Sequence, residues 1–423
     1  MPEHSPLDVP EGDPFGPHNL PYGLFSTHAD TNPRVGVRYG EAVLDTAAVA
    51  AALGSPHAAL LAAPTLAPLM AAGRPVWQSV RAEVTAWLTD PAHRAAVEPH
   101  LHALDRVAMH MPFEVGDYVD FYSSEHHAAN VGRIFRPGEE PLTPNWKHLP
   151  IGYHGRSGTV VPAGTPVVRP AGQRKRAADD PAAEVPSPAR PGPASPALPG
   201  PAFGPSIRLD IEAEVGFVVG VPSRMGTPVP RTAFRDHVFG VCLVNDWSAR
   251  DVQPWEQRPL GPHQAKSFAT SIGTWITPLD ALEAARTAPP ERTHPLLPYL
   301  DDTGADAQPD GYDLRLEVRI NGETVSRPPF AAMYWTAAQQ LAHMTVNGAS
   351  VRTGDLYASG TVSGPEQDQV GSLLELTKGK GPWLADGDVV EIDGWAPGPD
   401  GVRIGLGGVH GQVQPTGWTP QQA

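Results

Sequence analysis

The sequence predicts a mainly β protein with a small N-terminal β-barrel-like unit and a larger C-terminal domain of rolled or sandwiched sheets. Short apolar segments bounded by Gly, Pro, Asn or Asp recur through most of the 423 residues, whereas segments with helical spacing are few. The chain is long enough for two domains or one large one. It contains no internal repeat, no glycine-rich nucleotide-binding motif and no zinc-finger spacing.

The first 115 residues predict the smaller domain. Strand-like pieces separated by turn residues occupy 19–48, which favours a small barrel. Trp77, Val80, Val84 and Leu88 recur at spacings of three and four, which predicts a helix. A change of character near 107–114 predicts domains of 1–115 and 116–423.

Residues 116–423 alternate many short strands with few helices. Ser123 or Ser124 is expected to cap a helix, and Asn321-Gly322 favours a two-residue hairpin turn. Further helical patterning lies at 333–346, with a helical turn around Pro254. The expected strands are 209–220, 237–246, 267–276, 312–320, 323–325, 356–364, 372–377 and 389–395.

The segment 171–205 is a biased insert of Pro, Ala, Gly, Arg and Asp. Such a composition buries too little apolar surface to offset the entropy of ordering, so the insert is expected to be mobile. It ends directly before the strand predicted at 209–220. It could therefore gate whatever that strand binds, or it could be a loop without a role.

Composition excludes several classes of function. A formal net charge of −15 argues against a nucleic-acid partner. The single cysteine, Cys242, rules out an intramolecular disulfide, and the acidic, proline-rich N-terminus lacks the features of a signal peptide. The most apolar long window, 47–72, is broken by Gly and Pro and predicts no membrane span. The expected setting is the reducing cytoplasm.

The stretch 209–220, LDIEAEVGFVVG, is the most informative local feature. Its β-branched and aromatic residues predict a largely buried strand, yet it contains Glu212 and Glu214. On a strand these side chains point to one face, roughly 7 Å apart. Two buried like charges are costly, so a bound cation would explain them. A sheet edge with one solvated face is the alternative.

Two further acids sit in or at the end of apolar segments. With Glu212 and Glu214, the carboxylates of Asp120 and Asp246 would make an oxygen-only site, which suits Ca²⁺ or Mg²⁺ better than zinc. Asp120 could instead cap a helix or turn, and Asp246 could be a turn former.

His126 and His127 follow Asp120 at the start of the expected helix. One could act as a general base, although a surface histidine is the simpler alternative, and adjacent helical residues cannot both face a site. Glu375, within an apolar segment, could orient a histidine through one ring nitrogen. Because no nucleophilic side chain matches them, the pair indicates activated water.

Arg250, Gln253 and Lys266 are few for an anion-binding surface but would suit a pocket that stabilises an oxyanion beside a metal. Arg250, four residues after Asp246, could instead form an ordinary ion pair on a helix surface.

Long motifs from about Pro21 to about Val413 resemble the fumarylacetoacetate hydrolase family, in particular its members that carry an additional N-terminal domain. The resemblance implies an SH3-like N-terminal barrel and a C-terminal mixed β-sandwich roll. The motifs are VDFYSSEHHAANVGRIFR, PNWKHLPIGYHGR, RLDIEAEVGF, NDWSARDVQPWE, LGPHQAKSF, MYWTAAQQLAHMTVNG, GDLYASGTVSG and GSLLEL.

The family pattern implies a role for each matching residue. His127, rather than His126, matches the general base, and Glu375 matches its orienting acid. Lys266 and Thr270 also match positions associated with a second cation. The metal-ligand positions match Asp120, Glu212, Glu214 and Asp246; the oxyanion group matches Arg250, Gln253 and Lys266; the substrate contacts match Tyr122, Arg136, Tyr153, Gln253 and Thr361.

One position departs from the family pattern. Gln257 stands where the family has a substrate-contacting tyrosine, which puts the fit of the substrate in question. The implied reaction is metal-dependent hydrolysis of a C–C bond in a β-diketone acid, fumarylacetoacetate, with Ca²⁺ or Mg²⁺ in a homodimer. The alternatives are a related hydrolase acting on another acylpyruvate or β-diketone, and a metal-stabilised binding protein without turnover.

Overall fold

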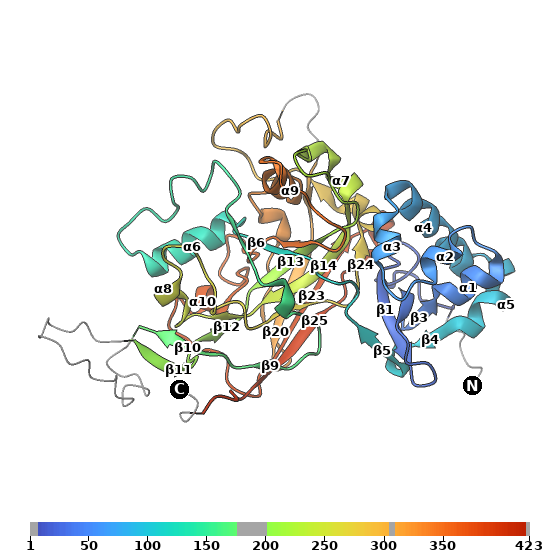
Figure 1. Cartoon of the computed structure of the whole chain (residues 1–423), viewed down its shortest axis with the longest axis horizontal. Coiled ribbons are helices and arrows are strands. Elements are labelled where there is room, and N and C mark those ends of the chain that lie inside the picture. Colours follow the sequence, from blue (N-terminus) through green and yellow to red (C-terminus); the bar gives the residue numbers. More distant parts are fainter. Residues whose placement is uncertain (1–6, 176–200, 304–308, 420–423) are drawn as a thin grey trace, which may run out of the picture.

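The fold has a smaller N-terminal part and a larger C-terminal part, which lie side by side along the long axis of the molecule (Figure 1). The computed structural model describes residues 7–175, 201–303 and 309–419. Most of its regular structure is short strands in layered sheets, which confirms the prediction of a mainly β fold.

The N-terminal part is one antiparallel sheet covered by helices. Asp45 caps α1 by accepting a hydrogen bond from the backbone N–H of Ala48, and Trp77, Val80 and Val84 are the buried stripe of α4, as their spacing predicts. The sheet order is β4 (Leu101–Ala103), β3 (Ala42–Asp45), β2 (Arg34–Tyr39), β1 (Tyr22–Thr27) and β5 (Val107–His110). The helices are α1 (Thr46–Leu53), α2 (Ala58–Leu61), α3 (Ala67–Ala71), α4 (Arg74–Thr89) and α5 (Arg94–Val97).

The C-terminal part contains two larger sheets. The six-stranded sheet includes the hairpin predicted at Asn321-Gly322, where Ile320 pairs with Glu323. The eight-stranded sheet comprises β7 (Gly152–His154), β6 (Tyr118–Phe121), β22 (Leu356–Ala358), β13 (Ala213–Val219), β14 (Val238–Asp246), β16 (Thr270–Ile272) and β8 (Val160–Pro162), with β17 (Thr277–Pro278) beside β14. The six-stranded sheet comprises β21 (Glu323–Ser326), β20 (Arg315–Ile320), β23 (Val389–Pro397), β25 (Val409–Gln414) and β9 (Val167–Val168), with β24 (Arg403–Gly405) beside β23.

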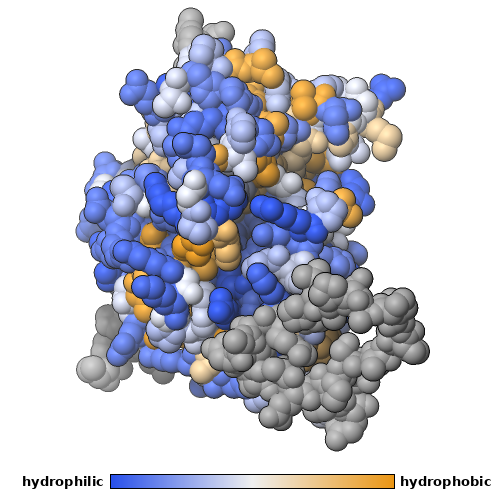
Figure 2. Space-filling model, turned by 90° about the vertical axis from the view of Figure 1, so that its left-hand side faces the viewer, coloured by the Kyte–Doolittle hydropathy of each residue, from blue (hydrophilic) through white to orange (hydrophobic). Residues whose placement is uncertain are grey.

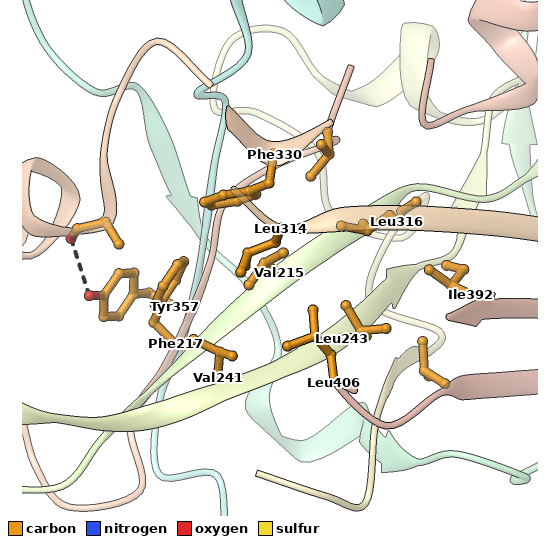
Figure 3. Close-up of a cluster of buried hydrophobic side chains, with 14 of the residues drawn as sticks. Val215, Phe217, Val241, Leu243, Leu314, Leu316, Phe330, Tyr357, Ile392 and Leu406 are labelled. Carbon is orange, nitrogen blue, oxygen red and sulfur yellow. Dashed lines mark hydrogen bonds between the residues drawn. The ribbon is translucent and has the colours of Figure 1, made fainter. Parts of the chain in front are cut away.

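The two C-terminal sheets pack face to face around the main core. From β13 and β14, Val215, Phe217 and Leu243 point toward Leu316 and Ile392 of the other sheet (Figure 3). The phenol of Tyr357 closes one end of this core by donating a hydrogen bond of 3.2 Å to the carbonyl oxygen of Ala337.

The other face of β13 and β14 packs against the N-terminal part. Val218 and Cys242 belong to a second core that also contains Trp77 of α4. A side chain at Gly220 would meet the Trp77 ring at 2.6 Å, so this glycine permits the close approach. Burial on both faces explains why these strands are continuous apolar runs rather than alternating ones.

The remaining elements lie outside these two larger sheets. Their main members are α6 (Glu125–Phe135), α8 (Gln253–Glu256), α9 (Ala337–Thr345), α10 (Leu373–Leu376), α7 (Phe234–His237) and the strand pairs β10 (Ala171–Arg174) with β11 (Ala202–Pro205), β12 (Leu209–Asp210) with β15 (Ser248–Ala249), and β18 (Arg286–Thr287) with β19 (Gly311–Tyr312). The face that carries α6 and α8 is mostly hydrophilic, with apolar side chains in small patches (Figure 2).

Two of the predicted strands are wrong, and one predicted insert is ordered at its ends. The strand expected at 209–220 is two strands, because β12 pairs with β15 whereas β13 pairs with β14, and Ile211-Glu212 forms the step between them. The strand expected at 372–377 is the helix α10. The ends of the insert at 171–205 form the ordered β10–β11 hairpin, and residues 176–200, where mobility was expected, lie outside the described residues.

Among the residues that the structure describes, no helix has the length and apolar character needed to cross a membrane.

Candidate active site

Four buried carboxylates meet at one edge of the eight-stranded sheet. Asp120 lies near the end of β6, Asp246 ends β14, and Glu214 lies near the start of β13. Because β13 runs antiparallel to β14 and to β22, and β6 runs parallel to β22, these three positions fall at the same edge. Glu212 joins them from the step before β13, where its carbonyl accepts the backbone N–H of Asp246 at 3.1 Å.

The cluster has the geometry of a cation site. One oxygen each from Asp120, Glu212, Glu214 and Asp246 can be chosen so that all four lie within 4.8 Å of one another. All four side chains are buried. The expectation that these four acids converge is therefore met, although Glu212 and Glu214 do not share one regular strand.

Two cationic side chains already contact the cluster. Lys266 binds Glu212 and lies 2.7 Å from Oδ2 of Asp246, and Arg250 forms an ion pair with Oε1 of Glu212 at 2.8 Å. Arg250 is shared with a fifth buried carboxylate, Asp210, to which its Nε donates a hydrogen bond of 2.8 Å. Four carboxylates and two cations leave a formal charge of −2, even before Asp210 is counted.

The two cations pair with Glu212 and Asp246 and leave Glu214 and Asp120 without an ion pair among the described residues. Both carboxylate oxygens of Glu214 and Oδ1 of Asp120 are buried without a hydrogen-bond partner among the described residues. An unpaired buried carboxylate is costly, and a divalent cation would supply the missing charge and the missing contacts together. The residues therefore fit a divalent metal ion.

The pKa values follow from this imbalance. Burial, and then the charges of Asp120, Asp246 and Glu212, raise the pKa of Glu214 well above its usual range. Burial and the charge of Asp246 do the same for Asp120. Burial also acts to raise the pKa of Glu212, but the charges of Lys266 and Arg250 outweigh it and lower the pKa of Glu212 to about 2.

Asp246 is held by polar neighbours as well as by Lys266. The hydroxyl of Thr270 donates to its Oδ1 at 2.8 Å, and the phenol of Tyr153 donates to its Oδ2 at 3.1 Å. A pocket of about 550 Å³ opens beside these groups and is lined by Asp246, Lys266, Tyr153 and Thr270. The carboxylate cluster is therefore reachable by a small molecule from this side.

A histidine and a glutamate also lie beside the cluster. Nδ1 of His127 is 2.7 Å from Oε2 of Glu375, and Nε2 of His127 is 4.0 Å from Oε1 of Glu212. The other partners of the Glu375 carboxylate are Asn130, Ser363 and Ser372. Burial acts to raise the pKa of Glu375, but the charge and hydrogen bond of His127 and the hydrogen bonds of Asn130 and Ser372 lower it.

Helix capping places both members of this pair. Ser124 caps α6 by accepting the backbone N–H of His127 at 3.1 Å, as predicted, and His127 is buried whereas His126 is half-buried. Ser372 caps α10 by accepting the backbone N–H of Glu375 at 3.3 Å. The prediction that Glu375 lies in a strand is thus wrong. The S-x-x-E spacing of Ser372 and Glu375 is a capping pattern that could have predicted the helix.

The other expected site residues lie at differing places around the cluster. Gln253 accepts a hydrogen bond from Arg250 at 3.2 Å, and the ring of Tyr122 packs edge-on against His127 with centroids 5.3 Å apart. Thr361 is buried, and its hydroxyl has no hydrogen-bond partner among the described residues. Arg136 donates to the carbonyl oxygen of Pro141, and Gln257 follows α8, bonded through its backbone N–H to Gln253.

Several residues with clear structural roles at the site were not predicted. Asp210 stands two positions before Glu212, within the same acidic stretch, which is a signal that could have identified it. Asn130 lies one turn after His127 on α6, where a side chain at i+3 shares the same face. Ser363 gave no signal of its own, because only the fold brings it to Glu375.

Fold and site together define a class of protein: a two-part, mainly β chain with a buried oxygen-ligand site beside a histidine–glutamate pair. Residues 118–414 match the family model described as fumarylacetoacetate (FAA) hydrolase C-terminal, and residues 18–112 match fumarylacetoacetase N-terminal. The chain belongs to the fumarylacetoacetate hydrolase family.

Named relatives match over nearly the whole chain. The fumarylacetoacetase of Homo sapiens is 40% identical over 97% of this chain and 98% of its own length. That of Caenorhabditis elegans is 41% identical over the same shares.

Solved structures share the fold at low identity. A fumarylacetoacetate hydrolase from Exiguobacterium antarcticum superposes with a TM-score of 0.54 at 16% identity, over 94% of this chain and 99% of its own. A maleylpyruvate hydrolase from Sphingobium sp. SYK-6 superposes with a TM-score of 0.52 at 17% identity, over 94% and 100%.

Proposed function

We propose that this chain hydrolyses the C–C bond of fumarylacetoacetate to give fumarate and acetoacetate, the reaction that ends tyrosine and phenylalanine catabolism. The observation that carries the proposal is a carboxylate cluster with an excess of negative charge beside the His127–Glu375 pair. Nε2 of His127 lies 4.0 Å from Oε1 of Glu212. The identity of about 40% to named fumarylacetoacetases over nearly the full length supports the same substrate.

The proposed cofactor is Ca²⁺ or Mg²⁺, held by the carboxylates of Asp120, Glu212, Glu214 and Asp246. Oxygen-only ligation favours these hard cations. The related maleylpyruvate hydrolase of Sphingobium, with a TM-score of 0.51, is described in complex with manganese(II) and pyruvate, which supports a divalent ion beside a keto acid in this fold. When bound, the cation would act as a Lewis acid that polarises the carbonyl under attack. Lys266 and Thr270 are proposed as neighbours of a second cation.

His127 is the proposed general base. With its Nδ1 proton held by Glu375, the imidazole presents Nε2 as an acceptor toward the cluster. It would remove a proton from water, and the hydroxide would add to the substrate carbonyl carbon. General acid–base catalysis of this kind contributes about 10²–10⁴-fold.

Arg250, Gln253 and Lys266 are proposed to stabilise the oxyanion formed by this addition. Removing one such donor typically costs 10²–10³-fold in rate, or about 3–4 kcal/mol. As the carbonyl re-forms, the C–C bond breaks and its electron pair leaves as an enolate. The proton taken up by His127 returns to that carbon, which gives acetoacetate, and the acyl half leaves as fumarate.

Substrate contacts are proposed for six side chains around this centre. Tyr122 and Tyr153 are the best placed, since Tyr122 packs on His127 and Tyr153 bonds Asp246. The full proposed set is Tyr122, Arg136, Tyr153, Gln253, Gln257 and Thr361.

One observation favours a second candidate, a related hydrolase of another acylpyruvate or β-diketone acid. Gln257, next to α8, replaces a ring of the family pattern by an amide, which would change the shape and polarity of the substrate pocket. A metal-stabilised binding protein without turnover is disfavoured because it needs no buried histidine–glutamate pair. A homodimer in the cytoplasm, with domains of 1–115 and 116–423 and neither nucleic-acid nor membrane partners, completes the proposal.

Incubation of the purified protein with fumarylacetoacetate and Mg²⁺ or Ca²⁺ tests the proposal. We expect loss of the diketone ultraviolet band with equimolar fumarate and acetoacetate identified by NMR. Hydrolysis of another acylpyruvate but not of fumarylacetoacetate would establish the second candidate. No C–C cleavage of any β-diketone acid by cation-loaded protein would contradict the assignment as a hydrolase.

A further inference from the structure

Asp210 is a fully buried carboxylate that is none of the proposed metal ligands. It ends β12, where it pairs with Ser248 of β15, two residues before Arg250. Each of its oxygens accepts two hydrogen bonds. Oδ1 accepts the backbone N–H of Ile211 at 2.7 Å and of Leu373 at 2.8 Å, and Oδ2 accepts Nε of Arg250 at 2.8 Å and the backbone N–H of Leu374 at 3.0 Å.

The first arm of this network reaches the carboxylate cluster. Nε of Arg250 is fixed by Asp210, Nη1 donates to Gln253, and Nη2 contacts Glu212. The guanidinium is planar, so a bond at Nε sets the direction of both terminal nitrogens. Asp210 thereby sets the orientation of Arg250 toward Glu212 and Gln253.

The second arm reaches the histidine–glutamate pair. Leu373 and Leu374 are the first two residues of α10, and their free N–H groups both end on Asp210. Glu375 is the next residue, and its side chain holds His127. A helix of four residues has too few internal hydrogen bonds to be stable by itself, so these two contacts with Asp210 fix the position of Glu375.

We propose that Asp210 is a positioning residue that couples the oxyanion group to the general base, by holding Arg250 and α10 on one carboxylate. This inference rests on the proposed function for the roles of Arg250 and His127. Four donors converge on two oxygens, and an asparagine, which has a single acceptor oxygen, cannot accept from all four.

The test uses Asp210→Asn with Asp45→Asn as a matched control. Asp45 is also buried, also caps a helix and also accepts from an arginine Nε, that of Arg34 at 2.6 Å, but it lies in the N-terminal sheet away from the site. If the loss of a buried carboxylate acted only through stability, both variants should lose activity alike. Because Asp210 is proposed to position Arg250 and Glu375, we expect Asp210→Asn to lower kcat about 10²-fold with KM within about threefold, and Asp45→Asn to leave both nearly unchanged.

Coupling to Glu375 provides the sharper readout, because Asp210 and Glu375 share no side-chain contact. If Asp210 acts through α10, the kcat loss of Asp210→Asn combined with Glu375→Gln should be smaller than the product of the two single losses by about tenfold or more. Losses that multiply, or equal kcat losses in Asp210→Asn and Asp45→Asn, would overturn the inference.

Amide hydrogen exchange separates this inference from the proposed function. In cation-free protein, without substrate, the peptide containing Leu373 and Leu374 should lose protection in Asp210→Asn and keep it in Asp45→Asn. Unchanged protection would overturn the inference even if the enzyme turns over fumarylacetoacetate, whereas inactivity of the unmodified protein would count only against the proposed function. Should Asp210→Asn fail to fold, Asp210→Glu, which keeps the charge but displaces both oxygens, replaces it with the same expected results.

Discussion

Nδ1 of His127 lies 2.7 Å from Oε2 of Glu375, although 248 positions separate the two residues in the chain. The first helical turn of α6 carries the histidine, and α10 carries the glutamate, which three other donors also hold. This contact assigns the Nδ1 proton to the glutamate side and leaves Nε2 facing the carboxylate cluster. A histidine held in this way can take a proton from water only at Nε2.

His127→Ala should lower kcat for fumarylacetoacetate about 10²–10⁴-fold, because it removes the proposed proton acceptor. Glu375→Gln should reduce kcat less, since the imidazole remains but its Nδ1 proton is held more weakly. His126→Ala, a change at the adjacent half-buried position, serves as the control and should retain activity. Full activity in His127→Ala would refute the role of the base.

Glu214→Gln should weaken divalent-cation binding at least about tenfold, as measured by calorimetric titration, because it removes a ligand charge from the cluster. The same change should raise the Tm of the cation-free protein at pH values above the raised pKa of Glu214. There the buried carboxylate is ionised and has no hydrogen-bond partner among the described residues, so its charge is uncompensated. Wild-type cation affinity in Glu214→Gln would contradict its role as a ligand.

Cation binding should release protons and strengthen as pH rises. Burial and neighbouring carboxylates raise the pKa of Glu214 and of Asp120 in the cation-free fold, so these groups hold protons that a cation must displace. A raised carboxyl pKa stabilises the fold below the ordinary carboxyl range, and that contribution is lost as pH rises through the raised value. The cation-free protein should therefore lose Tm with rising pH, and added Ca²⁺ should restore it.

The measurement is a pair of thermal scans across pH 5–9, with chelator and with Ca²⁺, together with calorimetry in buffers of different ionisation enthalpy. Cation binding without net proton release would contradict the claim that Glu214 and Asp120 are protonated in the cation-free protein. So would a Tm difference between the two scans that does not grow with pH.

Gln257→Tyr should lower KM for fumarylacetoacetate with little change in kcat, because it restores the ring of the family pattern at a position outside the proton-transfer and oxyanion groups. Steady-state kinetics on fumarylacetoacetate and on one acylpyruvate would measure the effect. Gln264→Tyr, at an exposed position on the same loop, is the control. A fall in kcat with unchanged KM would show that Gln257 does not contribute to substrate fit.

Much of the site was predictable because its residues break local rules. Glu212 and Glu214 are charges in a buried apolar stretch, and Ser124 is a cap that places His127 on the first turn of α6. Charges within an apolar stretch and a capping serine can both be recognised in the sequence alone. The predominance of strands followed in the same way from the spacing of turn residues.

The errors depend in large part on information that the fold supplies. LLEL at 373–376 is apolar enough for a strand, and the capping pattern of Ser372 and Glu375 is its local signal for a helix. The backbone N–H groups of Leu373 and Leu374 are satisfied by Asp210, which lies 163 positions before Leu373. The step at Ile211-Glu212 arises because the chain changes partner from β15 to β14. Neither the contact with Asp210 nor the change of partner strand produces a pattern of apolar residues that could be recognised in the sequence.

The most direct test of metal-dependent hydrolysis by this protein is the rate of fumarylacetoacetate cleavage as a function of bound divalent cation, starting from protein stripped by a chelator and refilled stepwise with Ca²⁺ or Mg²⁺. We expect negligible cleavage in the stripped protein and a rate that rises with the amount of bound cation, saturating near about one tightly held ion per chain. Full cleavage by protein shown to hold no divalent cation would contradict the account.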